Sequence, residues 1–372
     1  MEGIISVSIK EIIMKIALFF DIFAEKGGSE RVAIDIAKKM NADIYTTYVD
    51  WKNSDEDLRK LKIKEIGLFF KNSKLLTYSE IAFRFSKLKT SKYDIYLFTR
   101  LYCASASKNH SPNIWICNSP NRGLYDLHET VYNRLNFWQK PLFKLWCFIY
   151  CFFDKSWTKN FNKVLANSRN TQKRLKKYYN INSKVLYHPV DTKKFRCKKY
   201  GDYYFTINRF TKEKRVDLIV KAFKKMPDKK LVIAGDGPEK NNLVNLSENS
   251  KNIFFIGNVN LSKKIDLYAN CLATIYMPVD EDYGIVPIES MASGKPCIAV
   301  NEGGCKETII DKKSGFLIKA NENEIIKIVS SLKLENIKKM KEDCIKQAKK
   351  FDINIFILNL KNEIKELVNV KK

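Results

Sequence analysis

The sequence predicts an α/β fold in which two parallel sheets are each flanked by helices. Short apolar runs, typical of buried parallel strands, recur along the chain and begin with MKIALFF at residues 14–20. Helical segments follow most of these runs, and this alternation indicates βαβ units. The alternation stops at VLYHPVDTKKF, residues 185–195, where Pro189 breaks the pattern and polar residues follow. We therefore expect two Rossmann-like halves joined by a short hinge.

In the first half, the strand at 14–20 leads through a glycine loop into an amphipathic helix at 25–40. The apolar residues on one face of that helix are Val32, Ile36, Ala37 and Met40. The next predicted elements are strands at 42–49, 93–100, 113–120 and 163–168, a strongly aromatic segment at 136–157, and a basic helix at 171–179.

The second half repeats the pattern. Its predicted strands lie at 202–210, 229–238, 253–259, 272–278, 296–300 and 314–318. Its predicted helices lie at 216–226, 263–271 and 288–294, and the part of the chain from Glu322 is helical by its period. A length of 372 residues agrees with about two domains.

The charge of the chain allows several kinds of partner, and its cysteines indicate the compartment. The chain has a net charge of +26, and Asp191 is the only acid between Asp154 and Asp202. Nucleic acid, anionic lipid and a phosphorylated substrate all suit this charge, and a lysine-rich solvated surface suits it equally. The nine cysteines include no Cys-x-x-Cys pair, so we expect reduced thiols in a cytoplasmic protein. We expect no secretory signal and no membrane span, and Met14 is an alternative start.

The stretch EDYGIVPIESMASGKPCIAV, residues 281–300, places two glutamates eight positions apart. Pro287 suits the first turn of a helix, and Gly294 suits its end. The N–H groups that begin such a helix form an anion site. Glu281 and Glu289 would then face one crevice and accept hydrogen bonds from sugar or ribose hydroxyls. Alternatively, one glutamate caps the helix and the other is solvated.

Two further motifs follow predicted strands. INRFTKEKRVD places Arg209 and Lys214 five positions apart before a helix, where two cations suit a diphosphate, although a solvated basic turn is the alternative. Gly235 and Gly237 in AGDGP would permit a tight turn with close backbone approach to a ligand. The glycines of GGSER, including Gly28, would do the same in the first half, at a helix N-terminus.

In this order and spacing, the motifs resemble those of the family 4 retaining glycosyltransferases (glycosyl transferases group 1). That family has the GT-B fold, with two Rossmann-like parallel-sheet domains facing a central cleft. The resemblance covers nearly the whole chain from Met14. It rests on GGSERVAIDIA, ANSRNTQKRL, HPVDTKKF, NRFTKEKRVDLIVKAF, AGDGP, FIGNV and EDYGIVPIESMASGKPCIA, the last of which matches the family's Glu-x7-Glu signature.

The resemblance implies roles for individual residues. Arg209 and Lys214 would neutralise the donor diphosphate, Glu281 would hold the transferred sugar, and Glu289 would hold the ribose. The residues expected at the reaction centre are Arg209, Lys214, Glu281 and Asn118. The residues expected to bind the donor are Gly28, Gly235, Gly237, Gly257, Val259, Tyr283, Gly284, Ile285 and Glu289.

Two features bear on this chemistry. Related sequences usually have a histidine where ICNSPNRGLYD has Asn118, and an asparagine can orient a hydroxyl but cannot accept a proton. Asp280–Asp282 imitates an Asp-x-Asp metal motif, but we expect no metal and no other cofactor, because the Arg–Lys pair already supplies positive charge.

The resemblance assigns the predicted domains. We expect an N-terminal acceptor-side domain at 14–186, preceded by an extension at 1–13, and a C-terminal nucleotide-sugar-binding domain at 187–350. A final helix at 351–372 would pack on the N-terminal domain. The expected donor is GDP-mannose or a UDP-sugar, and the expected acceptor is a lipid-linked or cell-envelope saccharide, as for mannosyltransferases of polysaccharide assembly.

Two other functions remain open at this stage. A non-catalytic GT-B subunit that supports a partner transferase is favoured only by Asn118, and no motif indicates nucleic-acid binding. A peripheral position on the inner face of the membrane fits the lipid-linked acceptor. We expect an exposed part of residues 136–157 to contact an anionic surface, and the alternative is a buried helix packed under the sheet of the first half. The helix TQKRLKKYY would add the cations Lys173, Arg174, Lys176 and Lys177.

Overall fold

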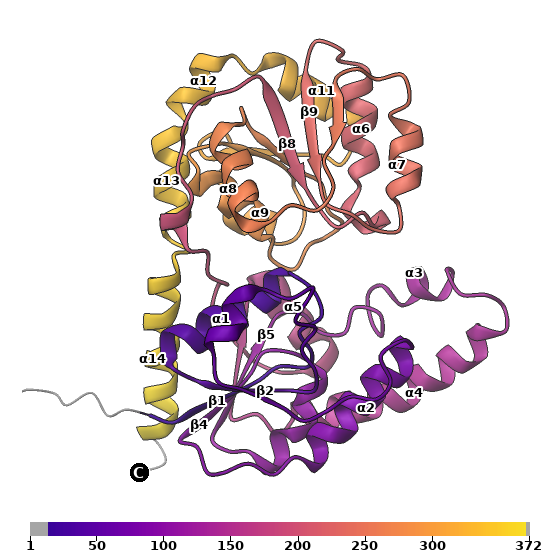
Figure 1. Cartoon of the computed structure of the whole chain (residues 1–372), viewed down its shortest axis with the longest axis vertical. Coiled ribbons are helices and arrows are strands. Elements are labelled where there is room, and N and C mark those ends of the chain that lie inside the picture. The colour runs from indigo at the N-terminus through magenta and orange to yellow at the C-terminus, as the bar shows by residue number, and fades with distance from the viewer. Residues whose placement is uncertain (1–13, 370–372) are drawn as a thin grey trace, which may run out of the picture. The chain divides into compact units, whose positions relative to one another are not determined.

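The computed structural model describes residues 14–369, so the expected extension at 1–13 lies outside the described residues (Figure 1). Two parallel sheets organise the chain, which confirms the predicted α/β class. The described residues form two compact units, one of residues 14–117, 121–164 and 361–369 and the other of residues 118–120 and 165–360. The domain limits expected from the sequence stay a prediction.

The first sheet has seven strands in the order β3-β2-β1-β4-β5-β6-β7. Its strands are β1 (Ile16–Phe19), β2 (Asp43–Thr46), β3 (Ile63–Glu65), β4 (Ile95–Phe98), β5 (Asn113–Cys117), β6 (Lys163–Ala166) and β7 (Lys184–Val185). Its associated helices are α1 (Gly28–Met40), η1 (Glu56–Lys60), α2 (Lys74–Lys87), η2 (Tyr102–Asn109), α3 (His128–Tyr132), α4 (Gln139–Thr158) and α5 (Arg169–Tyr179).

The second sheet has six strands in the order β10-β9-β8-β11-β12-β13. Its strands are β8 (Tyr203–Ile207), β9 (Lys230–Ala234), β10 (Ile253–Phe255), β11 (Thr274–Tyr276), β12 (Cys297–Val300) and β13 (Gly315–Ile318). The helices are η3 (Thr192–Lys194), η4 (Lys212–Lys214), α6 (Val216–Lys224), α7 (Lys240–Leu246), α8 (Leu261–Asn270), α9 (Ile285–Ala292), α10 (Cys305–Thr308), α11 (Glu322–Ser331), α12 (Leu334–Lys339), α13 (Lys341–Lys349) and α14 (Ile353–Asn369).

Helices cover both faces of the second sheet, which is why its strands are apolar on both sides. In β9, Leu231 and Ile233 pack into a core that contains residues of α6 and α11. The alternate residues Val232 and Ala234 pack into a second core with residues of α8, α9 and α13. The period of two along the strand thus divides one continuous apolar run between two cores.

The end of α14 is tied to the first sheet by charge. Lys163 of β6 donates from Nζ to the carboxylates of Glu363 at 2.7 Å and Glu366 at 2.8 Å. Within residues 14–369, no helix combines the length and the apolarity needed to cross a membrane. All nine cysteines are free thiols, in agreement with their lack of a paired spacing.

Candidate functional site

The candidate site lies at the point where the strand order of the second sheet reverses. Strands β8 and β11 are neighbours, but the chain continues from β8 towards β9 and β10, and from β11 towards β12 and β13. The loops that leave the carboxyl ends of β8 and β11 therefore diverge, and doubly wound sheets bind ligands in the crevice between such loops. The β8 loop carries Arg209 and Lys214, and the β11 loop carries Glu281.

The structure brings two of the predicted site residues into contact. The Nζ of Lys214 forms an ion pair with the carboxylate of Glu281 and donates to the hydroxyl of Tyr276 at 3.5 Å. Burial raises the pKa of the Tyr276 phenol well above its usual range. Arg209 lies earlier on the same loop with an exposed side chain. Lys214, which is expected to bind a diphosphate, thus lies beside Glu281, which is expected to bind a sugar.

Helix α9 begins as its sequence predicts. Gly284 precedes it with φ of +84°, Ile285 is its first residue, and Pro287 lies in its first turn. The helix ends at Ala292, and Gly294 follows with φ of +66°. Because the first N–H groups of a helix have no intrahelical acceptor, those that open α9 are suited to an anion.

Glu289 lies one turn into α9 and is buried. Its carboxylate accepts a hydrogen bond from Nζ of Lys264 on α8 at 2.5 Å. The two glutamates of the motif therefore have separate lysine partners, supplied by segments that follow different strands. Sequence reasoning missed Lys264, because nothing local in LSKKIDLYAN distinguishes it from its neighbours.

The glycines after β9 approach the β8 loop very closely. A Cβ on Gly235 would lie 1.8 Å from the backbone oxygen of Asn208, and one on Gly237 would lie 2.5 Å from that of Phe210. These glycines therefore let the chain pack against the loop that carries Arg209. By contrast, a Cβ on Gly257, which has φ of +68°, would meet no atom within 4 Å. Open space beside the backbone thus occurs at Gly257, one of the residues expected to bind the donor.

A second glycine pair, missed from the sequence, supports the Glu281 loop. A Cβ on Gly303 would lie 2.3 Å from the backbone oxygen of Glu281, and one on Gly304 would lie 2.5 Å from Tyr283. The N–H of Gly304 donates to the Glu281 oxygen at 2.8 Å. Nearby, the carboxylate of Glu302 accepts the N–H of Asp280 at 3.1 Å. The pattern NEGGCKE was the available signal for this support.

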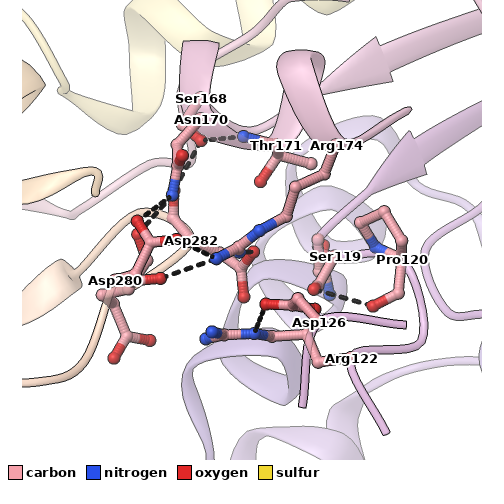
Figure 2. A network of polar contacts seen from close by, with 12 residues as sticks. Ser119, Pro120, Arg122, Asp126, Ser168, Asn170, Thr171, Arg174, Asp280 and Asp282 are labelled. Carbon is pink, nitrogen blue, oxygen red and sulfur yellow. Dashed lines mark hydrogen bonds and ion pairs between the residues drawn. The ribbon is translucent and has the colours of Figure 1, made fainter. Parts of the chain in front are cut away.

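The Glu281 loop is also held by α5 (Figure 2). The guanidinium of Arg174 donates to the carboxylate and the backbone oxygen of Asp280, both at 2.8 Å, and forms an ion pair with Asp282. Arg174 is only 6% exposed. The acids on either side of Glu281 thus share one buried cation. Sequence reasoning placed Arg174 among membrane-facing cations, and this was wrong.

Other contacts fix α5 against the same loop (Figure 2). Asn170 donates from Nδ2 to the Asp280 carboxylate at 3.1 Å and to the Glu281 backbone oxygen at 3.0 Å. The hydroxyl of Ser168, which caps α5, donates to the backbone oxygen of Asp282 at 2.5 Å. The carboxylate of Glu307 accepts the first N–H groups of α5 at 2.8 and 2.9 Å. Asn170 and Ser168 therefore hold the backbone oxygens of Glu281 and Asp282, and Glu307 holds the start of α5.

Asn118 follows β5 with its amide unused. Neither its Oδ1 nor its Nδ2, both buried, has a hydrogen-bond partner within the described part of the chain. Its backbone oxygen accepts a hydrogen bond from Nδ2 of Asn167 at 2.8 Å. Because a buried amide without partners is costly, an amide in this state is suited to a ligand that satisfies it.

Gly28 opens α1, in agreement with the predicted loop and helix. The buried carboxylate of Glu30 lies close by, since it would meet a Cβ on Gly27 at 2.3 Å, and it pairs with Arg100 at 3.1 Å. Gly28 belongs to the other compact unit, and its contact with a donor stays a prediction.

His188 lies beneath the β11 loop. The Tyr283 hydroxyl donates to the His188 backbone oxygen at 2.9 Å. Burial lowers the pKa of the His188 imidazole to about 3. This histidine is thus neutral at ordinary pH and is part of the packing under Tyr283.

No group of three or more His, Cys, Asp or Glu residues in 14–369 is arranged to hold a metal ion. The acids of the Asp-x-Asp imitation, Asp280 and Asp282, are instead paired with Arg174. The expectation that no metal takes part stays a prediction.

Comparison with known proteins identifies relatives. Residues 189–351 match the family described as glycosyl transferases group 1. The chain is 24% identical over 361 residues to the alpha-1,3/1,6-mannosyltransferase ALG2 of Candida glabrata, covering 76% of this chain and 75% of that protein. It is 31% identical over 210 residues to ALG2 of Dictyostelium discoideum, covering 48% of this chain but only half of that relative's length.

Solved structures share the architecture. The structure of Anabaena Alr3699/HepE in complex with UDP and glucose matches with a TM-score of 0.72 and 17% identity, over 95% of this chain and 99% of that chain. At this identity the likeness establishes the fold alone.

Proposed function

We propose that this chain, a glycosyltransferase of group 1 with the GT-B fold, is a retaining enzyme that moves a sugar from a nucleotide sugar to a lipid-linked or cell-envelope saccharide. The proposed donor is GDP-mannose or a UDP-sugar. The activity named for the ALG2 relatives, alpha-1,3/1,6-mannosyl transfer, favours mannose.

One observation carries the proposal. Lys214 on the β8 loop and Glu281 on the β11 loop meet at the topological switch point of one sheet, and Arg209 lies earlier on the β8 loop. Cations, a carboxylate and a helix N-terminus are the groups that a nucleotide sugar requires. The cations and N–H groups suit its diphosphate, and the carboxylate suits sugar hydroxyls.

In the proposed reaction, the bond between the anomeric carbon and the diphosphate breaks as an acceptor oxygen attacks from the same face. Negative charge grows on the leaving diphosphate, and Arg209, Lys214 and the α9 N-terminus stabilise it without rearranging. The leaving phosphate oxygen takes the proton of the acceptor hydroxyl. Asn118 can orient that hydroxyl through its unpaired amide and need not accept a proton.

The ion pair between Lys214 and Glu281 implies an exchange of partners on donor binding. A diphosphate offers Lys214 a stronger anionic partner, because several phosphate oxygens share its charge. The Glu281 carboxylate can then accept hydrogen bonds from the transferred sugar. Lys214 and Glu281 would thus each have a polar partner both before and after the donor binds.

An anionic membrane surface is the third proposed partner, beside the donor and the acceptor. A lipid-linked acceptor must be reached at a bilayer, and the net charge of +26 favours an anionic one. We place the enzyme in the cytoplasm, at the inner face of the membrane. No metal is proposed, so a chelator should leave turnover unchanged; loss of turnover that is restored by Mg²⁺ or Mn²⁺ would contradict this.

A thermal-shift screen against UDP, GDP and their sugars tests the proposal. One nucleotide series should raise the melting temperature, and binding to none would remove the core of the argument. Arg209→Ala and Lys214→Ala should each raise the barrier by about 2–4 kcal/mol, by analogy with lost oxyanion donors. The matched control is Lys212→Ala, an exposed lysine of the same loop.

A further inference from the structure

Helix α4 is apolar on two opposite faces. Its inner face packs inside the first compact unit, where Cys147 and Tyr150 join Leu124 in a small core. Its outer face is exposed although it is equally apolar; the exposed side chains are Leu142, Leu145, Phe148, Ile149, Phe152 and Phe153. These positions recur at helical spacing and so form one continuous stripe.

The stripe is too exposed for an ordinary helix surface. Phe148 is 80% exposed and Phe152 is 73% exposed, and the exposed Phe137 and Trp138 continue the apolar surface before the helix. Figure 1 shows α3 and α4 reaching away from the strands of the first sheet. Large contiguous apolar patches of this kind mark a surface that binds a partner.

The charges around the stripe have one sign. Residues 139–159 contain four lysines, at positions 140, 144, 155 and 159, and a single acid, Asp154. Asp154 is fully buried and accepts a hydrogen bond from the Tyr125 hydroxyl at 3.0 Å, so it faces inward. Lys144, Lys155 and Lys159 are exposed. An exposed apolar stripe on a helix whose own exposed charges are all lysines is complementary to an anionic surface with an apolar interior.

We propose that the outer face of α4 is the element by which the chain docks on an anionic lipid bilayer. The helix would lie in the plane of the interface, with Phe148 and Phe152 among the acyl chains and lysines at the headgroups. The 20-residue helix is not apolar enough to cross the bilayer. This inference rests on the proposed function, because it would place the transferase beside its lipid-linked acceptor.

The structure changes which cations can contribute. Lys173, Lys176 and Lys177 of α5 are exposed, but Arg174 is buried and paired with the Glu281 loop. The docking surface is therefore defined by α4, and Arg174 is excluded from it.

Co-sedimentation of the full chain with phosphatidylcholine vesicles, with and without phosphatidylglycerol, tests the proposal. We expect binding only when phosphatidylglycerol is present, and weaker binding at high salt. Phe148→Ser with Phe152→Ser should lower the partition coefficient more than tenfold. Lys144→Gln with Lys155→Gln should lower it roughly fivefold for each lysine.

The matched control uses α14, where Ile355 and Leu358 are also exposed and lie three positions apart. Ile355→Ser with Leu358→Ser should bind vesicles as the unchanged chain does. Thermal melting of every variant shows whether it is folded. Equal binding by the phenylalanine and control variants, or binding indifferent to phosphatidylglycerol, would overturn the proposal.

Two further readouts separate other outcomes. Light scattering without lipid would reveal a second copy as the occupant, if the phenylalanine variant abolished a dimer. Nucleotide binding measured on the same samples separates this inference from the proposed function. Vesicle binding without nucleotide binding would contradict only the function, and nucleotide binding without vesicle binding would contradict only the docking surface.

Discussion

Replacing Arg174 should impair catalysis although the side chain carries no proposed role in the chemistry. Arg174 binds Asp280 and Asp282, the residues on either side of Glu281 (Figure 2). Arg174→Gln keeps much of the side-chain volume but removes the charge and most of the donors. Two acids would then repel one another in the loop that positions Glu281.

The size of the effect follows from the exposure of the two acids. Asp282 has a side chain only 16% exposed, and losing a hydrogen bond to so buried a charge costs about 1.5–3 kcal/mol. The Asp280 side chain is 50% exposed, so its pair with Arg174 contributes about 0.2–1 kcal/mol. Together these losses amount to about 2–4 kcal/mol of the free energy that keeps the loop ordered.

The assay is steady-state kinetics with the nucleotide sugar, together with thermal melting. Because a misplacement of about 1 Å can cost roughly a hundredfold in rate, kcat/KM should fall by about that factor. The control is Lys173→Gln, which removes a neighbouring exposed cation of α5. It should leave both kcat/KM and the melting temperature unchanged.

A second variant separates positioning from general damage. Adding Asp282→Asn to Arg174→Gln removes the uncompensated charge, so it should restore part of the lost activity. A single Arg174→Gln variant with kcat/KM within twofold of the unchanged enzyme would refute the reasoning. The reasoning would also be refuted if the double variant lost more kcat/KM than the two single variants do together.

Three further predictions concern single residues. Glu281→Ala should reduce turnover and sugar-nucleotide affinity but spare the bare nucleoside diphosphate, whereas Glu289→Ala should weaken both ligands in calorimetry; equal diphosphate affinity of the Glu289 variant would contradict its ribose role. Asn118→His should be tolerated or raise the rate, and a wild-type chain that is inactive until this change is made would instead favour a non-catalytic subunit. For His188, the folded pKa of about 3 lies below the ordinary 6.5, so the unfolded chain binds an extra proton as the pH falls below 6.5. This should remove about 2 kcal/mol of stability between pH 7 and pH 5. Urea unfolding should show His188→Phe to be less acid-sensitive, and an unchanged pH slope would count against this account.

The elements of the second sheet were predictable because most of its strands are buried on both faces, as β9, β11 and β12 are. LATIYMP and PCIAV contain strands β11 and β12, and Pro287 and Gly294 lie where α9 begins and ends. Elements with weaker patterns were missed. Strand β3 has three residues, of which Lys64 and Glu65 are exposed, so it gives no apolar run. Helix α2 was missed as well, although four of its residues are buried: Thr77, Ile81, Ala82 and Phe85.

The supports of the candidate site were less predictable than its motifs. The motifs are local, since Arg209 and Lys214 lie on one loop, and Glu281 lies on the loop just before the recognisable start of α9. Their partners come from far along the chain: Arg174 is 106 residues from Asp280, and Lys264 is 25 residues from Glu289. A basic helix such as α5 gives no sign of which cation turns inward. That choice depends on tertiary packing.

The two glutamates of the candidate site each have a lysine partner, which is possible because the chain is so rich in lysine. Glu281 pairs with Lys214 from the β8 loop, and Glu289 pairs with Lys264 from α8. The spacing of eight residues puts one acid in the loop and the other a turn into α9, so each meets a cation from a different segment. Because each acid is paired with a lysine, neither carboxylate stands alone beside the N-terminus of α9. A diphosphate can therefore bind without first overcoming the repulsion of two free carboxylates.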